Sequence, residues 1–216
     1  MKLLWAVYAV MWAGGTLVGG VSPETRWAAP LFLVVAGILT IAEHRVAWKS
    51  LAIAALLGVA FELAGVHTGL PFGRYVYTET LAPAVFGVPV VIAFAWLVLI
   101  DFVRGLTPSI AAGALLMTAA DLVIDPLAAG PLHYWRWLDP GPYYGIPWLN
   151  FAGWMLASLV ILALMPKTSR RMSWTGWSVI LFFTILAIER RLWLPALIGA
   201  GIAIVSPVML RNTQQA

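Results

Sequence analysis

Long apolar stretches, separated by short groups of proline, glycine and charged residues, make up most of the chain. Eight such stretches cover about residues 3–20, 29–43, 50–66, 82–103, 106–126, 148–165, 174–188 and 193–210. A transmembrane helix needs about 20 predominantly apolar residues, and the second and seventh stretches are short by this measure. The pattern therefore predicts an all-α fold, a polytopic integral membrane bundle of seven to eight transmembrane helices.

The composition supports the prediction of a membrane protein and excludes other classes of protein. Hydrophobic residues form 62% of the 216 residues and charged residues only 10%, with a mean hydropathy of +0.92. Soluble domains carry about 25% charged residues, so an ordinary soluble domain is excluded. The spans and their connections use the whole length, and residues 1–216 are expected to form a single transmembrane domain. Met1 and Lys2 begin the first stretch as a signal peptide would, but its apolar part exceeds about 7–15 residues and we expect it to be retained.

The net charge is weakly basic, with 13 Lys and Arg against 9 Asp and Glu and an isoelectric point of about 9.7. The bases are spread over short connections and form no basic cluster, which argues against nucleic acid as a partner. When successive connections alternate between the two sides, eight bases lie with the termini and five on the other side. Basic connections favour the cytoplasm, so we expect a multi-pass protein of the cytoplasmic membrane with both termini inside.

The counts of metal-ligating residues also limit the chemistry. The chain has no cysteine, which excludes disulfides, thiolate nucleophiles and iron–sulfur clusters. It has three histidines, but no His-x-x-x-His or Glu-x-x-His pair, and we expect no metal site. His67 and His133 are instead expected to be hydrogen-bonded interface residues.

Two connections between the predicted helices are rich in aromatic, glycine and proline residues. They are residues 67–78 (HTGLPFGRYVYT) and residues 131–148 (PLHYWRWLDPGPYYGIPW). As the third and fifth connections of an eight-helix arrangement, both lie on the same side of the membrane. Isolated Trp and Tyr residues at such places are typical of the aromatic belt at headgroup depth. For two such segments on one side, a binding site explains the pattern as well as an aromatic belt does.

Three carboxylates lie inside the predicted spans next to these two connections. Glu62 precedes residues 67–78, and Asp121 and Asp125 precede residues 131–148. An ionisable group inside a span costs about 2.5–3.5 kcal/mol on insertion and typically faces a cavity or a partner. Asn150 begins the sixth span on the same side. The pattern predicts a polar site where these residues converge.

Asp121 and Asp125 are four residues apart, so on a helix that continues to Pro126 their side chains share one face. Two buried carboxylates so placed cannot easily both ionise, and one is expected to hold a proton beside an ionised neighbour. This is the arrangement that general acid and base chemistry needs. The alternative is a structural ion pair of each aspartate with Arg74, Arg136 or a helix end.

The remaining intramembrane charges have simpler interpretations. Asp101 and Arg104 are three residues apart near the other end of the fourth span and are expected to form a local pair. Glu43, His44 and Arg45 end the short second span and are expected to be solvated.

Two groups of motifs resemble the CruF-type carotenoid hydratases, also called the carotenoid biosynthesis protein family. The first group is FELAGVHTGLPFGRYVYT at residues 61–78, then Leu81-Ala82-Pro83 and Gly87-Val88-Pro89 before Trp96. The second is Asp121 with Asp125-Pro126, then Trp137, Tyr143-Tyr144-Gly145-Ile146-Pro147 and Asn150-Phe151-Ala152-Gly153-Trp154. Together they cover about residues 60–155, with order and spacing kept. The first two and last two spans match only in being hydrophobic.

The resemblance implies an integral membrane enzyme that adds water across the terminal 1,2 double bond of an acyclic carotenoid end group. The implied substrates are lycopene, γ-carotene or, in C50 pathways, bisanhydrobacterioruberin, and the product is a tertiary alcohol. No redox cofactor is needed. The implied partners are the carotenoid and membrane lipid, and a homo-oligomer or an association with other carotenoid enzymes stays open.

The motif positions suggest roles for individual residues on chemical grounds. Hydration of the alkene needs a poorly solvated acid, stabilisation of a tertiary cation and one delivered water. We expect Asp121, Asp125 and Glu62 to be catalytic. The expected substrate-binding residues, mostly aromatic, are Arg74, Tyr75, Tyr77, Trp137, Tyr143, Trp148, Asn150 and Trp154. Aromatic faces would stabilise the cation by about 0.5–2 kcal/mol each, and Asn150 or an ionised carboxylate would orient the water.

Three other functions fit the same residues. A cyclase of the lycopene type would form the same cation but end in ring closure. A proton-coupled transporter would also use intramembrane carboxylates, although here they cluster on one side and no inverted repeat is visible. A carotenoid-binding subunit without catalysis is the third alternative.

Overall fold

The computed structural model describes the chain except residues 19–24, 26, 45–47, 166–170 and 214–216 and the side chains after residue 208. Within these limits it contains the helices α1 (Lys2–Val18), α2 (Ala28–Glu43), α3 (Trp48–Thr68), α4 (Ile92–Leu106), α5 (Ile110–Ala129), α6 (Trp148–Leu164), α7 (Trp174–Glu189) and α8 (Trp193–Thr213). The helical prediction is confirmed for every apolar stretch. Four bases used for the predicted orientation, Arg26, Arg45, Lys167 and Arg170, lie outside the described residues.

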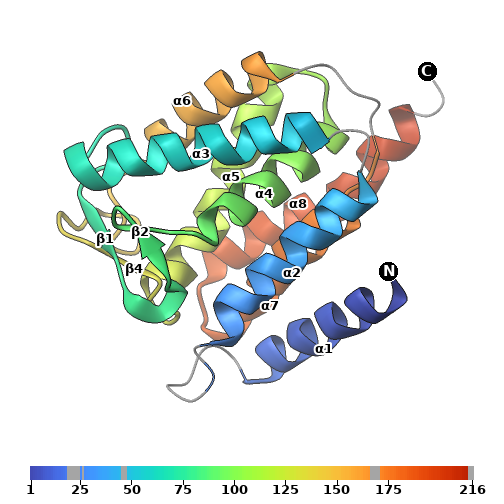
Figure 1. The fold of residues 1–216 in the computed structure, drawn as a ribbon, viewed down its shortest axis with the longest axis horizontal. Helices are drawn as coiled ribbons and strands as arrows, with labels where there is room; N and C mark the ends of the chain where they lie inside the picture. The colour runs from blue at the N-terminus through green and yellow to red at the C-terminus, as the bar shows by residue number, and fades with distance from the viewer. Residues whose placement is uncertain (19–24, 26, 45–47, 166–170, 214–216) are drawn as a thin grey trace.

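The helices pack around α4 and α5, which contact most of the others, while α1 lies at the outside against α2 and α7. The short strands gather at one end of the molecule, and the start of α1 and the end of α8 lie at the opposite end (Figure 1). A large cluster of buried apolar side chains, including Trp96, Phe102 and Met117, fills the interior. The strands and the ends of α3 and α5 that lead into them therefore share one end of the bundle.

The fourth helix is shorter than predicted. It begins at Ile92, because the apolar residues before it form a 3-10 turn (Glu79–Leu81) and a hairpin of β2 (Ala84–Val85) and β3 (Val88–Pro89). Phe86 and Gly87 connect the two strands with φ of 49° and 82°. Two residues with positive φ are the mark of a tight hairpin turn, so the prediction that the fourth span starts near residue 82 was wrong.

The fifth helix continues beyond its predicted end. It starts at Ile110, where the Ser109 hydroxyl accepts the Ala112 N–H at 3.3 Å, and it passes through Pro126 to Ala129. The proline lacks the N–H that would bond the Leu122 carbonyl. The Tyr143 hydroxyl donates to that carbonyl instead, at 2.9 Å. The helix thereby tolerates a proline one turn before its end.

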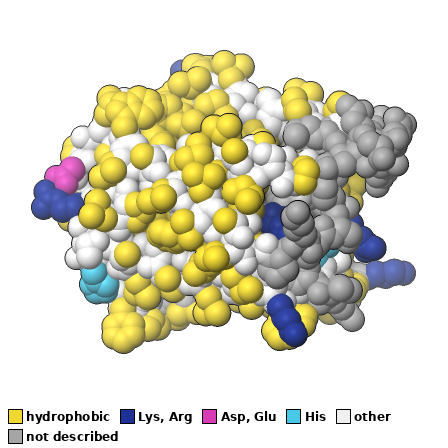
Figure 2. All heavy atoms as spheres, turned by 90° about the horizontal axis from the view of Figure 1, so that it is seen from above, with side chains coloured by type: hydrophobic (Ala, Val, Ile, Leu, Met, Phe, Trp, Pro, Cys, Tyr) yellow, Lys and Arg dark blue, Asp and Glu magenta, His cyan; other side chains and the backbone are white. Residues whose placement is uncertain are grey.

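Within the described residues, α3 and α5, with 21 and 20 residues, are long and apolar enough to cross a membrane on length and composition alone. The remaining apolar helices are shorter by this measure. Figure 2 shows one face of the molecule, on which hydrophobic side chains cover a broad middle and most visible charged side chains lie towards the two ends.

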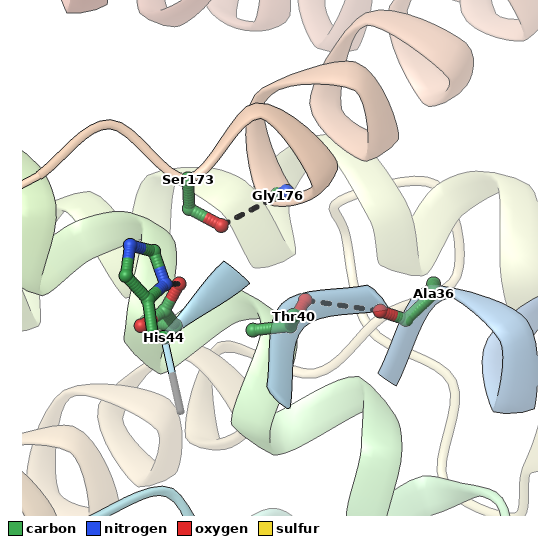
Figure 3. A network of polar contacts seen from close by, with 6 residues as sticks. Ala36, Thr40, His44, Ser173 and Gly176 are labelled. Atoms are coloured by element: carbon green, nitrogen blue, oxygen red, sulfur yellow. Dashed lines mark hydrogen bonds and ion pairs between the residues drawn. The ribbon is translucent and has the colours of Figure 1, made fainter. Parts of the chain in front are cut away.

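His44 is not solvated, contrary to the prediction. Its Nδ1 lies 2.8 Å from Asp101 Oδ2 in α4, and only 12% of its side chain is exposed. Glu43 beside it reaches Thr175 at the start of α7. Figure 3 shows His44 next to this start, where the Ser173 hydroxyl accepts the Gly176 N–H. The prediction failed because the ends of α2, α4 and α7 meet here and enclose the polar groups.

Candidate functional site

The two aromatic connections pair with each other in space. β1 (Tyr75–Tyr77) runs antiparallel to β4 (Trp135–Trp137), with Tyr75 opposite Trp137 and Tyr77 opposite Trp135. Successive side chains of a strand point to opposite faces, so the two tyrosines and two tryptophans share one face. Val76 and Arg136, between them, are exposed. The ribbon thus presents four aromatic side chains to the ends of the helices.

This aromatic face borders a cavity of about 90 Å³ inside the helix bundle. The cavity is lined from α2 through α7, and its polar and aromatic lining residues are Glu62, Phe72, Tyr75, Tyr77, Trp96, Asp121, Asp125, Tyr134, Trp135, Trp137, Asn150, Trp154 and Phe183. All three predicted catalytic carboxylates therefore line one cavity, together with five of the eight predicted substrate-binding residues.

Glu62 is held by three donors. Its Oε2 accepts hydrogen bonds from the Tyr75 hydroxyl and, at 2.8 Å, from the Tyr77 hydroxyl, and its Oε1 accepts the Trp96 Nε1–H at 3.1 Å. Burial, followed by the nearby Glu62 carboxylate, raises the pKa of both tyrosines, which therefore stay protonated and donate. Three donors on one carboxyl group favour its ionised form, whereas its burial favours the protonated form.

A glycine allows Trp96 to reach Glu62. Gly58 lies one helical turn before Glu62 on the same face of α3, and a Cβ at Gly58 would come within 2.3 Å of Trp96 Cγ. The indole therefore lies directly on the α3 backbone. Its other face stacks on Trp154 from α6, with ring centroids 4.5 Å apart. This places two parallel indoles in the wall of the cavity.

Asp121 and Asp125 share a single amide group. Asn150, in the first turn of α6, donates from Nδ2 to Asp121 Oδ2 at 2.6 Å and to Asp125 Oδ2 at 2.7 Å. Each aspartate is only 1% exposed and Asn150 is 2% exposed. Two carboxylates cannot both be charged in such a buried position without a compensating cation. The geometry therefore fits an aspartate pair that holds one proton.

The two aspartates differ in their other contacts. Asp125 Oδ1 also accepts the Trp135 Nε1–H at 2.7 Å. Trp137 Nε1 lies close to Asp125 but misses hydrogen-bond geometry, and this buried N–H has no partner among the described residues. Asp121 accepts no further hydrogen bond in the described part of the chain. Since donors favour the ionised form, the contacts favour Asp125 as the charged member.

The carboxylates have no basic partner in the described part of the chain. Arg74 binds Asp139 instead, with nitrogen–oxygen distances of 2.6 and 2.7 Å, and Arg136 points away from the cavity on the exposed side of β4. The alternative of a structural ion pair is therefore not found among these residues. No group of three His, Asp or Glu side chains suited to a metal ion occurs among them either.

Three predicted substrate-binding residues lie outside the cavity. Arg74 is exposed and pairs with Asp139, and Trp148 is 60% exposed. Tyr143 packs against Ile146 and Phe151 in a separate small cluster, where its hydroxyl bonds the backbone of α5. His67 and His133 are exposed and do not line the cavity. The structure does not bring these residues to the carboxylates.

Other lining residues were missed by the sequence analysis. Trp135 and Trp96 both donate to the carboxylates, and the alternation of Trp135 with Trp137 was the available signal for a strand. Leu33 in α2 and Phe183 in α7 come from the outer spans. These spans gave only a hydrophobic pattern, from which no contact with the cavity could be read.

The arrangement combines two buried aspartates that fit a shared proton, a third carboxyl group that accepts three hydrogen bonds, and several aromatic side chains. It can donate a proton to an apolar molecule, stabilise the resulting cation and accept a proton from water. The orphan Trp137 N–H beside Asp125 marks a place where one water could be held.

A comparison with curated proteins found a relative of this chain. A bisanhydrobacterioruberin hydratase from Haloarcula japonica is 34% identical over 145 residues, which are 61% of this chain and 48% of that protein. The chain thus spans about half the length of this relative. No solved structure matches the chain.

The family comparison covers more of the chain than the predicted signature region. The carotenoid biosynthesis protein family matches residues 27–206, which extends the resemblance from about residues 60–155 outwards to α2 and most of α8. The match includes every element that lines the cavity. From this match and the motifs around the cavity, the chain belongs to the carotenoid biosynthesis protein family.

Proposed function

We propose that this protein is a multi-pass membrane enzyme that hydrates the terminal 1,2 double bond of an acyclic carotenoid end group. The observation that carries the proposal is the pair of buried aspartates, Asp121 and Asp125, which share the Asn150 amide inside an aromatic cavity. An acid beside aromatic faces is what protonation of an unactivated alkene requires. The family and the hydratase name of the curated relative support the same reaction class.

A location in the cytoplasmic membrane, as a single domain, is part of the proposal. Leu3, Leu17, Leu56 and Leu197 are each at least 70% exposed, and the hydrophobic middle in Figure 2 has the character of a lipid-facing belt. Helices of 15–17 residues, such as α4 and α6, measure about 22–26 Å. They fit a bilayer that thins locally around the protein.

In the proposed reaction, Asp121 is the proton donor. It transfers its proton to C2 of the terminal double bond, the carbon with fewer substituents, and the π electrons form the new C–H bond. The positive charge is left on C1, which carries two methyl groups. Asp121, now charged, and Glu62 stabilise this tertiary cation, together with the faces of Trp154 and Tyr75 at about 0.5–2 kcal/mol each.

Water completes the proposed reaction at C1. A water molecule held between Trp137 Nε1 and Asp125 adds its oxygen to the cation, and the excess proton passes to Asp125. The aspartate pair then again holds one proton, which returns to Asp121 across the shared site. One alkene and one water give one tertiary alcohol, and no oxidant or reductant is consumed.

Expression in a lycopene-producing host tests the proposal. The wild-type gene should convert lycopene to a product heavier by one water, identified by chromatography and mass spectrometry. Asp121→Asn and Asp125→Asn should each lose this product, while the purified variants keep the wild-type size-exclusion profile. Asp139→Asn, which alters an exposed carboxylate outside the cavity, is the matched control and should keep activity. Full activity of both cavity variants would refute the assignment.

The same experiment separates hydration from ring closure. Cyclisation leaves the mass unchanged, whereas hydration adds one water. Because the proposed water site depends on Trp137 and Asp125, a product of unchanged mass would indicate that the cavity excludes water and closes the ring instead.

A further inference from the structure

A second cavity lies next to the carboxylate cavity. It has a volume of about 280 Å³, against about 90 Å³ for the first, and lies between α1, α2 and α7 near the residues that follow α5. Among the described residues, none of its lining side chains is charged, and most are apolar, among them Val10, Met11 and Phe182. This second cavity is called the tail cavity below.

The two cavities share part of their walls. Leu33 from α2, Tyr134 from the segment before β4 and Phe183 from α7 line both. The side chains of these three residues therefore form a wall that is common to both cavities. Because side chains change rotamers far more readily than helices move, such a wall can open without rearrangement of the bundle.

The carboxylate cavity is too small for a whole carotenoid. An apolar cavity of about 150 Å³ accommodates benzene, so about 90 Å³ takes an end group at most. An extended C40 chain is about as long as the hydrocarbon core of a bilayer, roughly 30 Å. The remainder of the chain must leave the carboxylate cavity through one of its walls.

We propose that the tail cavity binds the part of the polyene chain next to the end group of the substrate, and that the end group enters the carboxylate cavity between Leu33, Tyr134 and Phe183. This inference rests on the proposed function, whose substrate class it adopts. The described lining is uncharged and continues the wall of the acid site, which suits an apolar chain. A lipid acyl chain is the competing occupant.

Gly14 offers a way to fill the tail cavity without disturbing the helix. It lies in α1 and lines the cavity, and a Cβ at this position would meet no atom within 4 Å. Gly201 in α8 is the matched control, because its Cβ would also meet no atom within 4 Å and it lines neither cavity. The graded series Gly14→Ala, Gly14→Leu and Gly14→Phe is compared with the same substitutions at Gly201.

Two substrates with the same isopropylidene end separate the tail cavity from the acid site. Lycopene needs both cavities, whereas 2-methyl-2-butene is little more than the end group itself and depends on the first. The KM for lycopene should rise with side-chain size, by about tenfold or more for Gly14→Phe. The KM for 2-methyl-2-butene should change by less than about twofold, as should both values for the Gly201 series. An unchanged KM for lycopene throughout the Gly14 series would refute the proposal.

Pigment binding keeps this test independent of catalysis. Lycopene that co-elutes with purified protein is measured by its absorbance, and Gly14→Phe should lose it while Asp121→Asn and Gly201→Phe retain it. If the wild type binds lycopene, Gly14→Phe loses it, and no hydrated product forms, the proposed function is refuted but the proposed binding of the polyene chain in the tail cavity is supported. If the wild type hydrates lycopene and Gly14→Phe binds it equally well, the proposed binding of the polyene chain in the tail cavity is refuted, and a lipid acyl chain is the occupant instead.

Discussion

The Tyr143 hydroxyl donates a hydrogen bond of 2.9 Å to the Leu122 carbonyl, the backbone acceptor that Pro126 leaves without a helical donor. In a regular α-helix this carbonyl would accept the N–H of the residue four positions later, which proline lacks. Leu122 is the residue directly after Asp121. The tyrosine therefore fixes the last turns of α5, on which both aspartates depend, from outside the cavity.

Tyr143→Phe should lower stability more than it lowers substrate affinity. The substitution keeps the ring but leaves the Leu122 carbonyl without a partner, which costs about 1–3 kcal/mol when the group is buried. Thermal unfolding in detergent should show a lower Tm, with KM nearly unchanged. Tyr144→Phe is the control, because Tyr144 is 47% exposed. Equal Tm values for the two variants would contradict the role given to Tyr143.

Asn150→Ala should affect both stability and reaction rate. The variant leaves two buried carboxylates without their shared donor, at a cost of about 1–3 kcal/mol or more. Both Tm and kcat should therefore fall. Ser158→Ala in the same helix is the control, since the buried Ser158 hydroxyl has no hydrogen-bond partner among the described residues and its removal should leave Tm unchanged or higher. A normal kcat for Asn150→Ala would contradict the shared-proton arrangement.

Gly58→Ala should displace Trp96 from Glu62. The added Cβ would stand 2.3 Å from Trp96 Cγ, so the ring or the helix must move, and overpacking of this kind costs about 1–3 kcal/mol. Loss of the indole N–H from Glu62 should also reduce kcat. In Gly201→Ala the Cβ meets nothing within 4 Å, and helix propensity should raise stability slightly, by at most about 1 kcal/mol. A Gly58→Ala variant as stable as the wild type would show that Trp96 does not need this contact.

The helices and the three carboxylates could be predicted from the sequence because both leave strong local signals. Apolar stretches of this length predict helices whatever they pack against, and a carboxylate in such a stretch needs a partner or a cavity. Their convergence could be predicted because the two aromatic segments that follow them are the third and fifth connections, which lie on the same side of the membrane. The i, i+4 spacing of Asp121 and Asp125 placed both on one face, where Asn150 joins them.

The pairing of β1 with β4 could not be predicted, because it joins two segments about 60 residues apart and each strand has only three residues. Short strands carry too little alternation to stand out beside helices. The role of Tyr143 was missed for a related reason. Its partner is a backbone carbonyl freed by a distant proline, and an aromatic residue in a loop gives no sign of such a bond.

The pair of His44 and Asp101 makes stability depend on pH at the end of the bundle opposite the strands. The close contact with Asp101 raises the pKa of His44, burial opposes this rise, and the charge of Glu43 adds to it. A histidine whose pKa is higher in the folded than in the unfolded state contributes its full stabilisation of the fold below the unfolded pKa of about 6.5. This contribution is lost as the pH rises through the higher folded pKa.

Tm should therefore fall from pH 6 to pH 9 in the wild type, and Asp101→Asn should reduce this slope by removing the partner charge. His67→Gln, which changes an exposed histidine at the end of α3, should keep the wild-type slope, and an equally flat profile in that variant would assign the pH dependence to another group.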